Sequence, residues 1–460
     1  MTTRNAHITG RMVEAYGRVR SLVLQIRLVL KDWPLRNFLL LFLVYYLLAT
    51  LAVIARYDFN PSSLIHFGHY YIAQNESYTP EGAVRLVGNE EHGGNGYDGQ
   101  IFYYYARTLF LNDTWPQGFS HAYRAPRMGY PLLAAPFALF GSWGVVAGMI
   151  VVQIVLLAWS TGRLYRVLKP ESRYLILFYI LSPFTLTSYL LMVSNSITLA
   201  LLVIGYSFMF YAHETELYTR RPARLSVGQA IPAFVCFSLA IFSKESALFF
   251  LFPLGLSMLL NRDFSRAAIL IAILLPPFGW QMYLQAAHGM LPAGILSIFL
   301  SPLDGVYGVG RESLELLSTA VYEPGAGAVL ALMKLSAKWL LMLLIVGMGI
   351  ALFTGRFREW RYWFPHRAGI ILVLFSVLIA DYYYFWGIFD NIMRMFTLTV
   401  PLMILLKDCD ASVRSRVFFG FLFVLTLFVF ARILFLTPQF PFDTFHPYTG
   451  PAYEYVTPMP

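Results

Sequence analysis

The sequence predicts an all-α protein that crosses a membrane many times. Hydrophobic residues make up 58% of the 460 residues, and charged residues make up only 13%. A soluble domain has about twice that charged fraction, so this chain lacks the polar residues to cover a surface that faces water on all sides. The composition therefore excludes a soluble enzyme, a disordered scaffold and a collagen-like fibre. The two cysteines cannot form the framework of a disulfide-rich secreted domain.

Apolar runs long enough to cross a bilayer recur along the chain. A membrane-spanning helix needs about 20 mainly apolar residues, and sometimes as few as 17. Polar breaks at 193–196 and 242–245 divide two longer apolar stretches into separate helices. We predict about eleven spans on this basis. They cover residues 37–55, 142–162, 174–193, 195–212, 229–243, 246–261, 267–286, 335–354, 368–388, 394–406 and 417–436.

Basic residues between these runs indicate the orientation. With eleven spans, every basic cluster falls on one side of the membrane, which is the cytoplasmic side under the positive-inside rule. The N-terminus is then inside and the C-terminus outside. The net charge of +9 is explained by these loops rather than by binding of nucleic acid. The clusters lie at 4–36, 163–173, 220–224, 262–266, 356–367 and 407–416.

The chain divides into three parts. Residues 1–36 form a basic amphipathic arm on the cytoplasmic side, 37–436 form the transmembrane domain, and 437–460 form a Pro-rich extracytoplasmic tail. No cleavage site follows the first apolar run, so we expect it to remain as a helix. Two outer loops, 56–129 and 287–334, are long, and long loops are usually functional. We expect interfacial helices in the first.

The first outer loop contains a short motif around one carboxylate, Gly96-Tyr97-Asp98-Gly99-Gln100, followed by aromatic residues. The glycines give the backbone freedom around Asp98. The aromatic run suits the membrane–water interface, where Tyr rings are enriched. An aspartate there lies at the height of a lipid phosphate and meets a water-soluble acceptor. The alternative is a turn that caps an interfacial helix.

Two arginines follow in the same loop, just before an apolar stretch. Arg124 and Arg127 lie in the sequence Tyr-Arg-Ala-Pro-Arg-Met-Gly-Tyr-Pro-Leu-Leu. Guanidinium is the preferred bidentate partner of phosphate. The alternative is snorkelling toward the interface, but positive charge on the outer side runs against the topological bias.

Further charged residues lie at predicted outer corners. Lys244 and Glu245 separate two apolar runs, and ionisable residues at membrane depth are functional hypotheses by default. Their alternative is a self-contained ion pair at a hairpin tip. Arg394 opens a late span, and Asp390 lies four residues before it, where a local pair is the alternative. Asn195, at the break between two helices, is a weaker candidate.

Other features narrow the choice of chemistry. The sequence has no P-loop, no Rossmann glycine fingerprint, no Gly-x-Ser-x-Gly elbow and no zinc-type spacing. Without a nucleotide site, an activated group would have to arrive on a lipid.

Lys338 and Arg432 lie near outer helix ends, where we expect them to snorkel.

The motifs around Asp98 and Arg124, followed by Lys-Glu-Ser-Ala-Leu at 244–248, resemble those of bacterial polytopic membrane proteins related to the GT-C glycosyltransferases. They are similar, more distantly, to the PIG-V and PIG-M mannosyltransferases. Those enzymes carry an aspartate in the first outer loop. The resemblance covers roughly 37–260 and extends over the remainder by topology alone. Many GT-C members have an Arg-aromatic start to a late helix, and here Met395 intervenes between Arg394 and Phe396.

The resemblance implies an inverting enzyme that takes a hexose, such as mannose, from a polyprenyl-phosphate donor on the extracytoplasmic side of a bacterial inner membrane. The acceptor would be a lipid or a cell-envelope glycan. Asp98 would be the general base. We expect the four outer cations to hold the donor phosphate and five polar residues to position substrate. The cations are Arg124, Arg127, Lys244 and Arg394, and the positioning residues are Tyr97, Gln100, Glu245, Asp390 and Asn195.

We expect no cofactor, and this chemistry requires no metal, although Asp98 with Glu245 or Asp390 has the ligands to hold a divalent ion. Two other function classes remain open at this point. One is a non-catalytic membrane partner in glycopolymer assembly. The other is a lipid or sugar transporter, which would favour ionisable residues near the bilayer midplane and paired broken helices.

Overall fold

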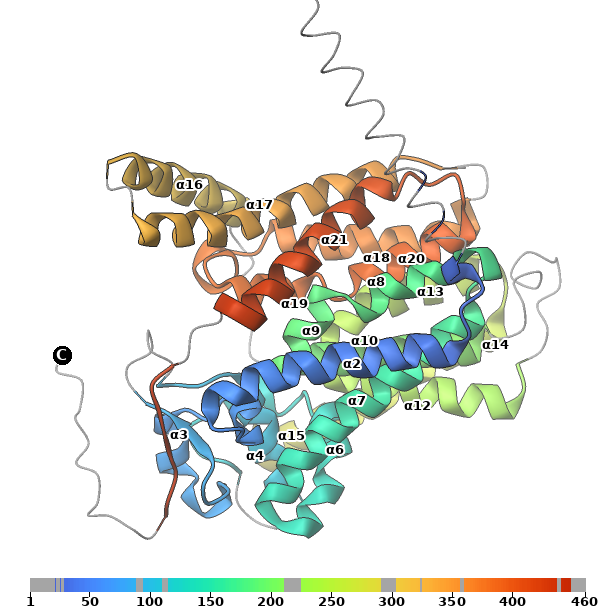
Figure 1. Cartoon of the computed structure of the whole chain (residues 1–460). Helices are drawn as coiled ribbons and strands as arrows, with labels where there is room; N and C mark the ends of the chain where they lie inside the picture. Colours follow the sequence, from blue (N-terminus) through green and yellow to red (C-terminus); the bar gives the residue numbers. More distant parts are fainter. Residues whose placement is uncertain are drawn as a thin grey trace, which may run out of the picture.

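The computed structural model describes residues 21, 25, 29–87, 94–109, 115–210, 225–290, 303–322, 325–355, 360–436 and 440–447. The described chain is a bundle of helices with one small two-stranded sheet (Figure 1). The prediction of a mainly helical protein is confirmed. The predicted arm 1–36 and tail 437–460 lie largely outside the described residues.

Six helical stretches in the described part of the chain are long and apolar enough to cross a membrane, and they identify an integral membrane protein. They are Leu35–Tyr57, Gly129–Val167, Phe264–His288, Ala331–Leu352, Phe389–Cys409 and Arg416–Phe435. The elements that form them are α2 (Leu35–Ile54), η1 (Ala55–Tyr57), α6 (Gly129–Ala134), η5 (Ala135–Phe140), α7 (Gly141–Val167), α14 (Phe264–Ala272), α15 (Leu275–His288), α17 (Ala326–Leu352), α19 (Phe389–Met395), α20 (Thr399–Cys409), α21 (Arg416–Ala431) and η11 (Arg432–Leu436).

The prediction of about eleven spans is too high by this measure. Four predicted spans are shorter apolar helices: α10 (Ser194–Met209), α12 (Val227–Ser243), η7 with α13 (Glu245–Ala247, Leu248–Leu260), and α18 (Trp360–Leu378), whose apolar part is Phe364–Leu378. The span at 174–193 is divided into α8 (Ile176–Ile180) and α9 (Pro183–Leu190).

Local backbone chemistry explains the division of 174–193. Pro183 lacks an N–H and cannot continue α8, so a new helix begins there with the Ser182 hydroxyl accepting from the Thr185 N–H. Met192 then takes a left-handed φ of 48° and ends the segment before α10. Apolar composition alone carries no sign of either event.

The helices place the loops at two ends. At one end, Lys169 donates from its backbone N–H to the Asp408 carboxylate at 3.1 Å, and the Arg367 guanidinium lies 3.9 Å from Asp410. These contacts join three of the predicted cytoplasmic basic clusters. The other end, which carries Asp98, holds the first outer loop, and we call it the Asp98 end. In Figure 1 this end lies toward the left, with α3 (His69–Gln74) and α4 (Asp98–Thr108) beside the far end of α2.

The first outer loop folds into short elements, several of them helical as expected. The sheet joins it to the C-terminal segment, because β1 pairs antiparallel with β2 and Arg85 forms an ion pair with Asp443. The elements are η2 (Pro61–Ile65), α3 (His69–Gln74), η3 (Glu76–Tyr78), β1 (Val84–Leu86), α4 (Asp98–Thr108), α5 (His121–Arg124) and, distant in sequence, β2 (Phe442–Thr444).

The described part of the second outer loop is helical. It contains α16 (Asp304–Tyr322), which lies beside the first part of α17, and the pair projects from the bundle in Figure 1. The π-helical turn η10 (Tyr382–Trp386) packs against α16. Lys338 on α17 is buried and pairs with Glu312 at 2.6 Å, so it does not snorkel as predicted. The remaining element is η6 (Pro170–Leu175).

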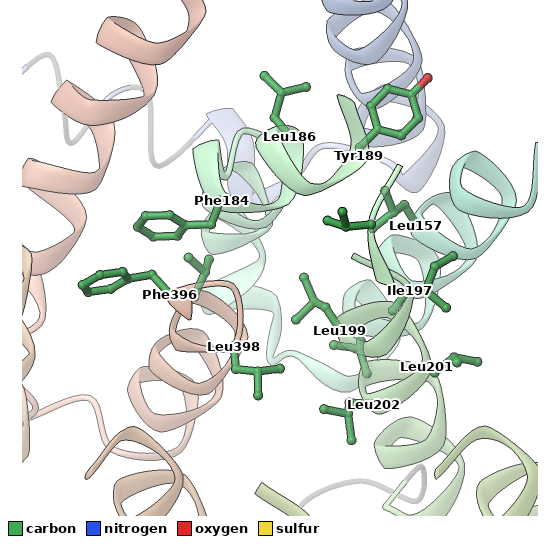
Figure 2. Packing of buried hydrophobic residues seen from close by; sticks show 14 of the residues in the cluster. Leu157, Phe184, Leu186, Tyr189, Ile197, Leu199, Leu201, Leu202, Phe396 and Leu398 are labelled. Carbon is green, nitrogen blue, oxygen red and sulfur yellow. The ribbon is translucent and has the colours of Figure 1, made fainter. Parts of the chain in front are cut away.

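A single apolar core connects the helices that carry the polar residues of the Asp98 end. Figure 2 shows Phe184 of α9 beside Phe396, and their rings stack with centroids 5.3 Å apart. Both side chains are fully buried. Because Phe396 lies two residues after Arg394, this contact fixes the position of the Arg394 backbone relative to α9 and α10.

Candidate functional site

Asp98 occupies the first turn of α4, and its flanking glycines are required by close packing. Gly96 has a left-handed φ of 64°, and a side chain there would lie 2.1 Å from the His66 carbonyl oxygen. A side chain on Gly99 would lie 2.7 Å from the Leu191 carbonyl oxygen. Gly96 therefore lets the chain before α4 pack against the backbone of residues 66–68, and Gly99 lets the start of α4 pack against the break before α10. The N-terminus of a helix also favours the negative charge of Asp98.

Two arginines hold the Asp98 carboxylate, one on each oxygen. Arg124 Nη2 lies 3.2 Å from Oδ1, and Arg394 Nη1 donates to Oδ2 at 2.9 Å. The Asp98 side chain is 28% exposed, so solvent can reach it. Arg394 lies 296 residues after Asp98 in the sequence, and the fold brings it to the same carboxylate as Arg124. Both arginines were predicted to bind the donor phosphate.

The arginines also control the acidity of Asp98. Burial alone would raise the pKa of this carboxyl, but the Arg124 and Arg394 guanidinium groups, with a smaller contribution from Arg127, hold it well below its usual range. Asp98 is therefore ionised at neutral pH. In this arrangement it is a weak base, because both oxygens are engaged and its pKa is far below the working pH.

Asn391, which the sequence interpretation did not single out, organises the Arg394 side of the site. Its Oδ1 accepts hydrogen bonds from the Tyr97 hydroxyl and from Arg394 Nη2. The Arg394 guanidinium also lies over the Tyr97 ring, 4.9 Å from its centre. Tyr97 thus positions Arg394, which in turn contacts Asp98. The only sequence signal for Asn391 is its place one helical turn before Arg394.

A second ion pair lies beside the first. Arg127 forms a bidentate pair with Glu245, with Nε donating to Oε2 at 3.0 Å. The Tyr123 ring, also missed from sequence, lies 4.7 Å from the Arg124 guanidinium and 4.3 Å from that of Arg127. Gly129 permits this arrangement, because a side chain there would lie 2.3 Å from Ser243 Oγ.

Lys244 does not pair with Glu245, so the expected alternative of a self-contained ion pair is wrong. Its ammonium group donates to Asn195 Oδ1 at 2.9 Å, and Asn195 Nδ2 donates to the Arg394 carbonyl at 2.9 Å. Burial, followed by repulsion from Arg394 and Arg127, lowers the pKa of Lys244 to about 7. Asn195 therefore links the end of α12 to the backbone of α19.

Two predicted substrate-positioning residues have other roles in this structure. Asp390 pairs with Arg432 at 2.9 Å rather than with Arg394, so neither the local pair nor the snorkelling of Arg432 is found. Gln100 is 1% exposed. Its amide accepts from the Gly68 N–H at 2.9 Å and donates to the Asn95 carbonyl at 2.7 Å. Gln100 holds the loop around Asp98 and is not open to a sugar.

The cluster carries more cations than carboxylates. Asp98 and Glu245 are its two anions, and the Asp390–Arg432 pair beside it is neutral. Two buried polar atoms at this place, Arg394 Nε and Ser243 Oγ, have no hydrogen-bond partner among the described residues. The cations are Arg124, Arg127, Lys244 and Arg394. We call these six side chains the Asp98 cluster.

The donor set is suited to an anion rather than to a metal ion. Within the part of the chain that the structure describes, no three His, Cys, Asp or Glu residues are grouped so that they would hold a metal.

Comparison of this chain with protein-family models, with curated proteins and with solved structures found no match in any of the three.

Proposed function

We propose that this protein is a membrane glycosyltransferase. It moves a hexose such as mannose from a polyprenyl-phosphate donor to a lipid or cell-envelope glycan acceptor on the extracytoplasmic side, with inversion. The observation that carries the proposal is the Asp98 cluster itself. It combines two solvent-accessible carboxylates, Asp98 and Glu245, with four cations, drawn from segments far apart in sequence and gathered at one end of the bundle.

The chemistry assigns a role to each part of the cluster. The Asp98 carboxylate accepts the proton of the acceptor hydroxyl, whose oxygen bonds to the anomeric carbon as the bond from that carbon to the phosphate oxygen breaks. The released polyprenyl phosphate keeps the bonding electron pair. Arg124, Arg127, Lys244 and Arg394 stabilise the negative charge that grows on the phosphate.

The depth of the cluster supports a lipid-borne phosphate. The helix that ends at Lys244, α12, has 17 residues and is about 26 Å long. The hydrocarbon core of a bilayer is about 30 Å thick. If α12 begins at the opposite interface, Lys244 lies close to the level of the lipid phosphates. A substrate phosphate held by a membrane-embedded prenyl chain would reach this level without leaving the bilayer.

The arrangement favours an enzyme over a transporter. Transporter sites lie near the bilayer midplane between repeated halves, whereas the charged residues of the Asp98 cluster gather where helices end. A non-catalytic partner would share the fold and the cluster. Measured transfer of the sugar therefore distinguishes an enzyme from a non-catalytic partner.

The test uses the purified protein in nanodiscs with a panel of polyprenyl-phosphate sugars, an acceptor extract and measurement of released polyprenyl phosphate. We expect one donor to support release and Asp98→Asn to reduce the rate by about 10²-fold or more. The control is Glu315→Gln, which removes an exposed carboxylate paired with Arg311 on α16, away from the cluster. Equal turnover in wild type and Asp98→Asn would remove Asp98 as the base, and no release from any donor would overturn the proposal.

A further inference from the structure

The resting arrangement of Asp98 conflicts with its role as a base. A general base must lie within about 3 Å of the proton that it takes, and it works best when its pKa is near the working pH. Arg124 engages Oδ1 and Arg394 engages Oδ2. Each contact is a charge-assisted interaction, which is stronger than a neutral hydrogen bond. In this state the carboxylate acts as an anion that satisfies two cations rather than as a proton acceptor.

Both arginines also contact groups other than Asp98. Asn391 accepts from Arg394 Nη2, and Asn195 accepts the ammonium of Lys244 while donating to the Arg394 carbonyl. The Tyr123 ring lies beside the Arg124 guanidinium at 4.7 Å. The cations are therefore preorganised, and a second anion would find them already positioned.

The charge of the cluster leaves room for that anion. Four cations face two carboxylates, and Arg394 Nε is buried with no hydrogen-bond partner among the described residues. A phosphate group brings more acceptor oxygens than a carboxylate and makes bidentate contacts with guanidinium. Phosphate therefore competes directly with the Asp98 carboxylate for the same donors.

We propose that the phosphate of a bound polyprenyl phosphate displaces Asp98 from Arg124 and Arg394, so that the carboxylate is free to accept a proton only when the donor is present. This inference rests on the proposed function, because it takes the donor to be a polyprenyl phosphate. In the absence of donor, the Asp98 carboxylate occupies the contacts with Arg124 and Arg394 that the substrate phosphate takes when it binds. Asn391 and Asn195 hold Arg394 in both states, and without a donor the base stays inactive.

The proposal makes an unusual prediction about binding. Removing the competing carboxylate strengthens binding of the phosphate, although it abolishes turnover. We would measure the affinity of wild type and Asp98→Asn in nanodiscs for a short-chain polyprenyl monophosphate that carries no sugar. We expect Asp98→Asn to bind about tenfold tighter, which corresponds to one charge-assisted contact. Glu315→Gln, which removes the same charge from the exposed α16 pair, should leave the affinity unchanged.

Two further ligands test which part of the polyprenyl monophosphate the protein recognises. The corresponding polyprenol lacks the phosphate, and its affinity should not respond to Asp98→Asn. Inorganic phosphate tests whether the anion alone is sufficient, and we expect the same direction of change with weaker binding. Equal or weaker binding of the monophosphate by Asp98→Asn overturns the proposal. A parallel gain for the polyprenol also overturns it, because the change would then be a general effect on the fold.

The outcome is separable from that of the proposed function, because these measurements contain no sugar. Tighter binding without transfer from any donor would support the displacement and overturn the glycosyltransferase. Transfer that depends on Asp98, without tighter binding by Asp98→Asn, would support the glycosyltransferase and overturn the displacement. If Asp98→Asn does not fold, infrared difference spectra of wild type with isotope-labelled aspartate decide. We expect the monophosphate but not the polyprenol to shift a carboxylate band, and the absence of that shift rejects the displacement.

Discussion

At the scale of single residues, the Asp98 cluster is a network in which each charged group has a defined polar partner. Asp98 joins Arg124 to Arg394, Glu245 holds Arg127, and Lys244 reaches Asn195. A charged side chain at this depth is costly unless it is paired. Of the four cations in the cluster, Lys244 has a neutral amide as its partner, and it is the one that loses its proton most readily.

Lys244 predicts a pH dependence of stability. Its pKa in the folded protein is about 7, below the ordinary value of 10.5. Between these values the unfolded chain binds a proton that the folded chain does not, so stability rises with pH across this window. The charged groups that act on Lys244 are Arg394, Arg127, Glu245 and Asp98.

The comparison variant is Lys244→Met, which keeps a similar side-chain length without a titrating group. We expect the Tm of wild type in detergent to rise relative to that of Lys244→Met between pH 7 and pH 9. A Tm difference that stays constant over this range would mean that Lys244 keeps its ordinary pKa. In that case the attraction of Glu245 and Asp98 would offset the burial of Lys244 and its repulsion by Arg394 and Arg127.

Some residues of the Asp98 cluster and its surroundings could be predicted from the sequence, and others could not. The Asp98 motif, the paired arginines and Lys244 stand out because charge and glycine are rare among apolar runs, and the structure brings them together. Asn391 and Tyr123 carry no such contrast, since amide and tyrosine side chains are common at membrane interfaces. The partners within the cluster were also not predictable. Local spacing favoured Asp390 with Arg394, whereas the folded chain pairs Asp390 with Arg432.

At the scale of elements, the close packing of α6 on α12 is the main constraint on the Arg127 side of the site. A side chain on Gly129 would lie 2.3 Å from Ser243 Oγ and 2.6 Å from the Leu239 carbonyl oxygen. We expect Gly129→Ala to destabilise the protein by about 1–3 kcal/mol, because the backbone atoms of α12 cannot yield without strain. The shift would also separate Arg127 from Glu245.

The matched control for Gly129 is Gly279 in the interior of α15, where an added side chain meets no described atom within 4 Å. Gly279→Ala should be neutral or stabilising by up to about 1 kcal/mol, because alanine favours the helix. Thermal unfolding in detergent measures both. If Gly129→Ala is as stable as Gly279→Ala, the contact between α6 and α12 does not determine the geometry of the site.

The positions of the long helices were easier to predict from the sequence than the number of membrane spans. Apolar composition located α2, α7, α17 and α21 because each is a long, uninterrupted run. It overestimated the spans where polar or constrained residues divide a run. Asn195 and Lys244 both lie at such divisions, next to helices that are too short by the length criterion, whereas Arg394 comes from the long stretch Phe389–Cys409.

At the scale of the whole molecule, the sidedness of the Asp98 end remains a prediction of the basic clusters. The helix α17 offers a direct test, because strongly exposed residues lie just outside its two ends. Tyr322 precedes it and is 84% exposed, and Phe353 follows it and is 82% exposed. We expect a membrane-impermeant maleimide to label Tyr322→Cys in intact cells and Phe353→Cys only after permeabilisation, in a background without Cys236 and Cys409.

The reverse labelling pattern would place the Asp98 cluster on the cytoplasmic side. Nucleotide sugars are available there, so the argument for a lipid-borne donor would lose its basis although the fold would stand. Labelling of both positions in intact cells would mean that α17 does not cross the membrane. With the expected pattern, Asp98 faces a compartment without nucleotide donors, and the surplus of cations around it is the feature that a lipid phosphate would satisfy.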